Sequence, residues 1–279
     1  MGTALVALPA LFAVIFLLPQ KNHLAFNCVI IIFATLSAFE FAGILRKKEI
    51  DINNAEAFVF GMLPALMLTL HVSFDWPLYG VLIAVFFCGG YSLISCALTG
   101  ATRLERAALR LAGNFAVILY PGAFLACAIL ISKLPFATVL IGVFLGTVFA
   151  NDIAAWFLGM LFGRGNKGII VASPNKSIAG FAGGFAGAMA AGVGASVVWP
   201  EVFTAVKFSA VNSGIILGLT TACAATLGDL AESAFKRSAG VKDSGILIPG
   251  RGGVLDCIDS ISLAAPVFCF VYHLLFLSA

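Results

Sequence analysis

Residues 137–162 read ATVLIGVFLGTVFANDIAAWFLGMLF, an apolar run interrupted by Asn151 and Asp152. A helix of about 20 such residues spans the hydrocarbon core of a bilayer. Comparable runs recur along the chain, at roughly 2–19, 24–45, 57–74, 78–99, 111–132, 137–162, 181–199, 208–231 and 260–277. The sequence therefore predicts an all-α polytopic integral membrane protein with about nine transmembrane helices.

The composition supports this class. Of the 279 residues, 61% are hydrophobic and 10% are charged, whereas charged residues make up about 25% of a typical soluble domain. A transmembrane β-barrel would show segments of about ten residues with alternating polarity, and the apolar runs here are continuous. The first run lacks a preceding basic segment, so we expect a retained helix there and not a cleaved signal peptide.

The basic residues predict the orientation of the chain. Of the 16 Lys and Arg residues, only Lys21, Lys133 and Lys207 fall in odd-numbered loops between the expected spans. The positive-inside rule then places the even-numbered loops and the N-terminus in the cytoplasm, and the C-terminus outside. After residue 150 the cytoplasmic loops become long and rich in glycine. We expect residues 1–110 to be structural, lipid-facing helices and 111–279 to be a catalytic region with loops 164–180 and 236–259.

Several ionisable residues interrupt the later spans, where a charge is costly. Asp152 lies in the sixth span, and Asp229, Glu232, Ser233 and Lys236 near the end of the eighth would share one helical face. The alternative is a set of ordinary interfacial charges at helix ends. Glu40, in the second span, could extend toward the cytoplasm beside Arg46; its role is left open.

The two long loops combine acids, cations and flexible backbone. Asp256 and Asp259 are three residues apart and would point the same way from one helix. A magnesium–polyphosphate site requires both kinds of residue, because carboxylate oxygens bind the metal ion and Lys and Arg neutralise the phosphate charge. A glycine-rich linker with solvated charges is the other interpretation. The polar and charged residues of these loops include Ser173, Lys176, Ser177, Lys242, Asp243 and Arg251.

Residues 233–259, SAFKRSAGVKDSGILIPGRGGVLDCID, resemble the defining motif of the phosphatidate cytidylyltransferases, in which S-x-x-K-R is followed by K-D-x-G, P-G-H-G-G and D-R-x-D. The stretches SPNKSIAGFAGG and NDIAAWFLGMLFG resemble two further segments of that family. The chain departs from the family pattern at Ala179 in place of Glu, Arg251 in place of His and Cys257 in place of Arg.

The resemblance implies that CTP and phosphatidate react to give CDP-diacylglycerol and pyrophosphate. It implies Mg²⁺, with a possible second, monovalent cation such as K⁺, and a possible homodimer. The expected partners are CTP, phosphatidate and membrane lipid, with no nucleic acid, at the inner membrane of a bacterium and with the site facing the cytoplasm. The implied roles are catalytic for Lys236, Arg237, Lys242, Asp243 and Arg251, substrate-binding for Asp152, Ser173, Asn175, Lys176 and Ser177, and metal-binding for Asp229, Asp256 and Asp259.

Other functions stay open at this point. A related enzyme could phosphorylate a lipid alcohol with CTP or make another CDP-lipid. A transporter would place carboxylates in several spans around an internal repeat, and the acids here gather in one stretch. The departures at Ala179, Arg251 and Cys257 also allow an inactive paralogue.

Overall fold

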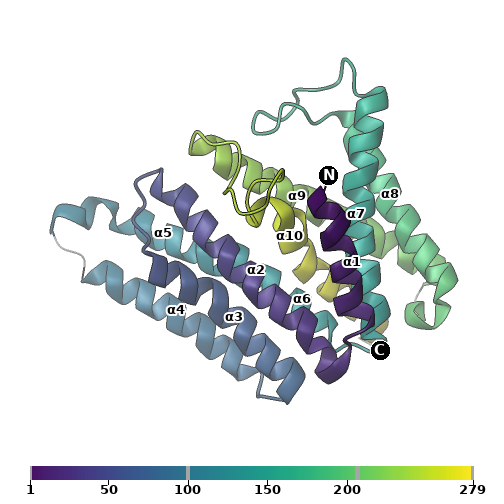
Figure 1. Ribbon diagram of the computed structural model, residues 1–279, viewed down its shortest axis with the longest axis horizontal. Coiled ribbons are helices and arrows are strands. Elements are labelled where there is room, and N and C mark those ends of the chain that lie inside the picture. The colour runs from purple at the N-terminus through teal and green to yellow at the C-terminus, as the bar shows by residue number, and fades with distance from the viewer. Residues whose placement is uncertain (1, 99–100, 205–207, 278–279) are drawn as a thin grey trace. The chain divides into compact units, whose positions relative to one another are not determined.

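The computed structural model describes residues 2–98, 101–204 and 208–277, and these residues contain no β-strand (Figure 1). Lys207 and the end of the expected span 78–99 lie outside the described residues. The all-α prediction is confirmed. The helices are α1 Gly2–Phe16, α2 Gln20–Arg46, α3 Asn54–Phe74, α4 Tyr79–Ala97, the 3₁₀ helix η1 Ala101–Arg106, α5 Ala107–Val117, the π-helix η2 Ile118–Phe124, α6 Ala128–Ile131, α7 Ala137–Phe162, α8 Ile178–Val198, the 3₁₀ helix η3 Pro200–Phe203, α9 Ala210–Ser238, α10 Leu255–Tyr272 and the π-helix η4 His273–Leu277.

Eight helical segments in the described part of the chain are long and apolar enough to cross a membrane. The first helix, α1, has 15 residues and is therefore shorter than the expected span 2–19. The fifth expected span is irregular, since a π-helix containing Pro121 separates α5 from α6. Proline has no N–H to donate and its ring disturbs the preceding turn, which accounts for the irregularity. The chain is an integral membrane protein, and its orientation stays a prediction.

The chain forms two compact units. Unit 1 comprises residues 1–133 and 235–258, and unit 2 comprises residues 134–234 and 259–279. In unit 1, α2 and α3 pack closely because position 61 is glycine: a Cβ there would lie 2.6 Å from the Ala34 carbonyl oxygen and from Ala38 Cβ. The expected functional division at residue 110 stays a prediction.

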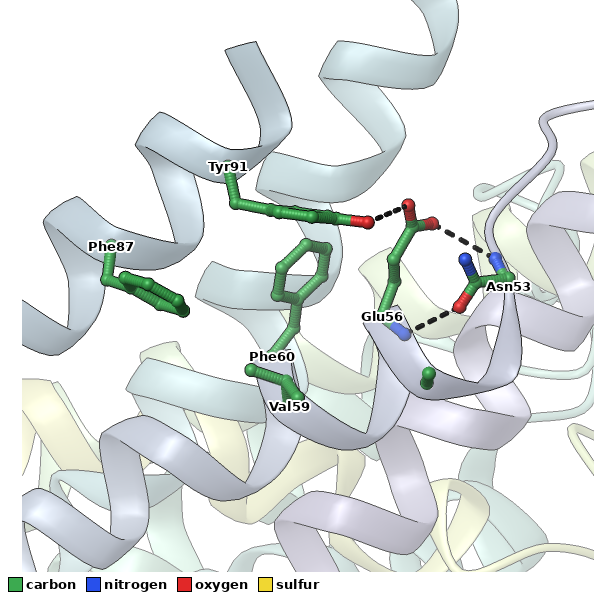
Figure 2. Close-up of a pocket in the computed structure, with 7 residues that line it drawn as sticks. Asn53, Glu56, Val59, Phe60, Phe87 and Tyr91 are labelled. Atoms are coloured by element: carbon green, nitrogen blue, oxygen red, sulfur yellow. Dashed lines mark hydrogen bonds between the residues drawn. The ribbon is translucent and has the colours of Figure 1, made fainter. Parts of the chain in front are cut away.

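Helix α3 begins at a capping box that also organises the α3–α4 contact in unit 1. The Asn53 side chain accepts a hydrogen bond from the Glu56 amide, and Glu56 accepts one from the Asn53 amide, at 2.7 and 3.1 Å. The Glu56 carboxylate further pairs with Arg110 at 2.6 Å and accepts from the Tyr91 hydroxyl at 3.2 Å. A pocket of about 260 Å³ lies beside this carboxylate, lined on its apolar side by Phe60 and Phe87 (Figure 2).

Unit 2 is built around helices packed through small residues. Helices α7 and α8 lie side by side (Figure 1). A Cβ on Gly187 of α8 would lie 2.6 Å from Ala154 Cβ of α7, and one on Gly218 of α9 would lie 2.5 Å from the Ala188 carbonyl oxygen of α8. Glycine at these positions allows the backbones to approach closely, as in other membrane helix pairs. The close packing fixes the positions of the polar residues that α7 and α9 carry.

Candidate active site

The polar residues near the end of α9 lie on one continuous helix, as predicted. Because α9 extends to Ser238, the residues Asp229, Glu232, Ser233 and Lys236 are spaced by three, four and seven positions along it. The Ser233 hydroxyl donates to the Asp229 carboxylate at 3.4 Å, and Glu232 is fully buried. The predicted helix is therefore confirmed, and the four-residue spacing of Asp229 and Ser233 brings their side chains into contact.

Asp229 is part of an acid–lysine cluster in unit 2. Its carboxylate forms an ion pair with Lys176 at 2.6 Å, and both side chains stay partly exposed. Asp152 of α7 lies within electrostatic range of this pair and accepts hydrogen bonds from the side chains of Asn151 and Ser260. Two carboxylates and one ammonium from three separate sequence segments are thus brought together. Such a cluster can bind a phosphate group or a divalent cation.

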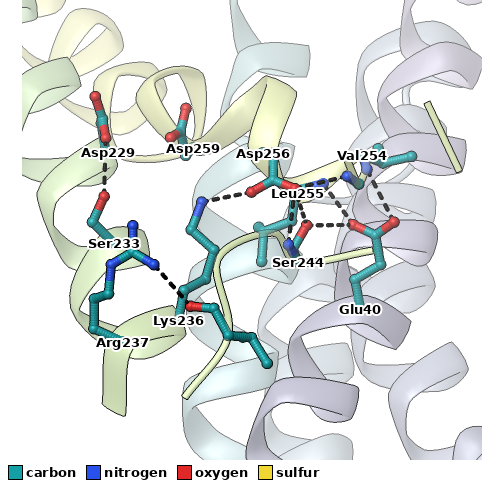
Figure 3. A network of polar contacts seen from close by, with 12 residues as sticks. Glu40, Asp229, Ser233, Lys236, Arg237, Ser244, Val254, Leu255, Asp256 and Asp259 are labelled. Atoms are coloured by element: carbon teal, nitrogen blue, oxygen red, sulfur yellow. Dashed lines mark hydrogen bonds and ion pairs between the residues drawn. The ribbon is translucent and has the colours of Figure 1, made fainter. Parts of the chain in front are cut away.

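A close crossing of α9 and α10 places Asp259 beside this part of unit 2. Gly228, the residue before Asp229, lies against the Asp259 carbonyl oxygen, so tightly that any Cβ at position 228 would collide with it. The Asp259 carboxylate accepts a hydrogen bond from the Ser260 amide at 2.6 Å. Asp229 and Asp259 therefore flank the point where the two helices meet (Figure 3).

The segment 163–177 forms a tight turn that places Lys176 beside Asp229. Gly165 and Gly168 have φ values of 90° and 82°, a region that glycine adopts easily. Ser177 is buried and caps α8, because its hydroxyl accepts the Gly180 amide at 3.0 Å. Of the other residues expected to bind substrate here, Asn175 is exposed and Ser173 is partly exposed. Their substrate roles, and that of Ser177, stay predictions.

Asp256, at the start of α10 in unit 1, holds the preceding loop. Its Oδ1 pairs with Lys236 Nζ at 2.5 Å, and both side chains are nearly buried. Its Oδ2 accepts from the Gly253 amide at 2.7 Å and from the amide and hydroxyl of Ser244, both at 2.9 Å (Figure 3). Both carboxylate oxygens are therefore engaged with the protein itself. The bonds between Ser244 and Asp256 therefore hold the two ends of segment 244–256 together.

Glu40 of α2 is a member of the same network that the sequence did not assign. Its carboxylate accepts the amides of Val254 at 3.0 Å and Leu255 at 2.8 Å, and the Ser244 hydroxyl lies 3.0 Å from it (Figure 3). The residue is 8% exposed, so it does not extend toward water beside Arg46, which was one option that the sequence left open. Arg46 bonds instead to the Ile52 carbonyl and to Asn54. The available signal was a carboxylate in an apolar span.

The loop between α9 and α10 presents its remaining charged side chains outward. Lys242, Asp243 and Arg251 are exposed, and Arg237 is exposed while donating to the Val241 carbonyl at 3.1 Å. Gly252, with φ of 96°, forms the tight turn in which the Ile248 amide donates to its carbonyl at 2.8 Å. Exposed cations on an ordered turn are suited to a polyphosphate.

Unit 2 carries carboxylates of the kind that a magnesium ion binds. Within the residues that the structure describes, no group of three or more His, Cys, Asp and Glu side chains is arranged as a metal site. Magnesium bound together with substrate phosphates needs only one or two carboxylates, and Asp229 and Asp259 supply such oxygens. Asp256 would first have to release Lys236 or an amide. The metal role of all three aspartates stays a prediction.

Comparison with known proteins gives one family and several bacterial relatives. A family described as the cytidylyltransferase family matches residues 1–275. A phosphatidate cytidylyltransferase of Haemophilus influenzae is 42% identical over 131 residues, which are 45% of this chain and 42% of the relative. A phosphatidate cytidylyltransferase of Pseudomonas aeruginosa is 39% identical over a stretch that covers 50% of this chain and 49% of the relative. The uncharacterized protein YnbB of Escherichia coli is 37% identical over a stretch that covers 43% of this chain and 38% of the relative. The chain thus spans less than half the length of each of these relatives.

Proposed function

Because the chain belongs to the cytidylyltransferase family, we propose that it transfers the cytidylyl group of CTP to phosphatidate, for phospholipid synthesis. The products are CDP-diacylglycerol and pyrophosphate. The observation that carries this proposal is the cluster of Asp152, Lys176 and Asp229, in which acids and a cation from distant segments meet in an apolar chain. The relatives named phosphatidate cytidylyltransferase support the choice of lipid.

The reaction balances without a protein nucleophile. A phosphate oxygen of phosphatidate attacks the α-phosphorus of CTP and forms a new P–O bond, while the bond between the α-phosphorus and the bridging oxygen breaks and its electrons leave with pyrophosphate. Since the attacking oxygen is already anionic, no general base is needed. The protein has to position the reactants and neutralise charge.

The unit 2 cluster would carry the metal and one phosphate. Bound Mg²⁺ would neutralise phosphate charge and polarise the P–O bonds, held by the carboxylates of Asp229 and Asp259. Lys176 would exchange its ion pair with Asp229 for a substrate phosphate. Asp152 lies within electrostatic range of that pair, so it can orient Lys176 or a bound cation. Ser173 and Asn175 would bind the same phosphate from the adjoining turn.

The loop in unit 1 would bind the triphosphate. Lys242, Arg237 and Arg251 are exposed cations there, and Lys236 is fixed by Asp256. Asp243, next to Lys242, would orient it. Arg251 stands where the family has His; its guanidinium binds phosphate but does not exchange protons at neutral pH. An anionic nucleophile makes this departure compatible with catalysis, and Arg251 can replace the cation that is lost at Cys257.

The same proposal includes the cellular setting. The even-numbered loops would face the cytoplasm, where CTP is made, and the lipid substrate would reach the site from the bacterial inner membrane. This orientation follows from the basic residues of those loops. A homodimer and a second, monovalent cation such as K⁺ are further parts of the proposal that rest on the family resemblance.

The test uses purified full-length protein in detergent with phosphatidate, Mg²⁺ and CTP, and measures the CDP-lipid formed. We expect Asp229→Asn to lower the rate by at least about 100-fold, because a ligand for phosphate-bound metal and the partner of Lys176 is lost. The matched control is Asp75→Asn, whose carboxylate is exposed and 3.3 Å from Lys133. We expect that control to retain activity within about twofold.

The alternatives give different results. CDP and a lipid phosphate as products would show a CTP-dependent lipid kinase. A CDP-lipid formed with another lipid and not with phosphatidate would show a different synthase. Folded wild-type protein that turns over no CTP would overturn the proposal and favour a transporter or an inactive paralogue.

A further inference from the structure

Glu40 is a buried carboxylate in a membrane helix, and hydrogen-bond donors far along the chain offset the free-energy cost of burying it. Such a group is unfavourable unless hydrogen bonds satisfy it. Here the compensating donors include the Leu255 amide, 215 residues later in the sequence, and the Val254 amide beside it. Both belong to the N-terminus of α10, where helix N–H groups lack partners within the helix and favour a negative charge. Glu40 therefore caps α10 from another helix.

The loop backbone is shaped to fit this carboxylate. A Cβ on Gly245 would lie 2.5 Å from Glu40 Oε1, and one on Gly253 would collide with Glu40 Oε2. Two glycines thus let the loop pass directly over the acid. Ser244 links the two carboxylates of the network, since its hydroxyl lies 3.0 Å from Glu40 and 2.9 Å from Asp256. Through Asp256 the network extends to Lys236.

We propose that Glu40 is a positioning residue that holds loop 239–254 and the first turn of α10 in the conformation that binds the triphosphate of CTP. The proposal rests on the proposed function, because the loop carries the cations assigned to that phosphate. In this proposal Glu40 acts through the backbone of Val254 and Leu255 and through Ser244, and it does not itself contact the nucleotide.

The first test compares Glu40→Gln with Glu56→Gln in full-length protein. Both replace a buried glutamate of unit 1 by its neutral isostere, and Glu56 instead serves α3, Tyr91 and Arg110. In Glu40→Gln, hydrogen exchange of the Val254 and Leu255 amides should accelerate at least about tenfold, because each loses a charged acceptor. In Glu56→Gln their exchange should stay within about threefold of the wild type.

Kinetics separate positioning from folding. For Glu40→Gln we expect kcat/KM for CTP to fall about tenfold to a hundredfold, largely through a higher KM for CTP, with KM for phosphatidate within about twofold. A smaller folded fraction would lower kcat and leave both KM values unchanged. An unchanged KM for CTP in folded Glu40→Gln protein would overturn the proposal.

A second variant keeps the test decisive if Glu40→Gln folds poorly. Gly245→Ala leaves the carboxylate in place and pushes a methyl group against it; its matched control is Gly90→Ala, where a Cβ meets nothing within 4 Å. Gly245→Ala should reproduce the faster exchange and the higher KM, and Gly90→Ala should show neither. Normal exchange in Gly245→Ala would count against the proposal. If wild-type protein makes no CDP-lipid, the proposed function fails, and the exchange experiment alone still decides whether Glu40 anchors the loop.

Discussion

Asp256→Asn should destabilise unit 1 strongly, because Asp256 is the centre of a nearly buried network. Lys236 is 11% exposed at the side chain and Asp256 is 8% exposed, with 2.5 Å between their charged atoms. Breaking one partner of such a pair leaves an uncompensated charge, at a cost of about 3–5 kcal/mol. The amides of Ser244 and Gly253 also lose a charged acceptor, so the free energy of unfolding should fall by at least about 3 kcal/mol.

The assay is chemical unfolding of the purified protein in detergent, without nucleotide or Mg²⁺, so that metal binding plays no part. The double variant Lys236→Met/Asp256→Asn should recover much of the loss, because no unpaired charge then remains. Asp75→Asn, with an 88% exposed side chain, is the control and should change stability by about 0.5 kcal/mol or less. If Asp256→Asn unfolds like the wild type while losing activity, Asp256 is a metal ligand and the structural role described here is wrong.

Three further predictions concern the site. Gly228→Ala should lower activity at least about tenfold and stability by about 1–3 kcal/mol, because its methyl group pushes Asp259 away from α9; activity and unfolding measured together check this, and full activity would contradict it. Ser177→Ala should cost about 1 kcal/mol as a lost helix cap and keep most of the activity, whereas a large rise in KM at unchanged stability would show that Ser177 binds substrate. Removal of divalent ions with EDTA should abolish CDP-lipid formation and added Mg²⁺ should restore it, as measured in the same assay; activity that survives EDTA would contradict a magnesium requirement.

The sequence predicted the elements whose signals are local. Apolar length alone identified the membrane helices, because backbone groups in lipid must be satisfied within the segment. The helical spacing on α9 was also correct, since three-residue and four-residue spacings determine which side chains share a face. Asp256 and Asp259 both lie on α10, as expected, and a common direction of their carboxylates stays a prediction. The short α1 and the π-helix at Pro121 were missed, because hydropathy does not report helix length or local irregularity to within a few residues.

The missed contacts are those made across long sequence separations. Nothing near Glu40 in the sequence indicates that its partners are Val254 and Leu255, because a carboxylate on a helix end could equally extend to water. Ser177 shows a different limit: a serine in a polar loop could bind substrate, and only the structure shows its hydroxyl accepting the Gly180 amide. Backbone partners decide both roles, and residue type alone does not reveal them.

The most direct test of cytidylyl transfer follows the α- and γ-phosphates of CTP in parallel reactions with phosphatidate and the wild-type protein. Attack at the α-phosphorus predicts that the α label enters the lipid and that the γ label appears in pyrophosphate in equal amount. A γ label in the lipid, or pyrophosphate released without a labelled lipid, would contradict the account.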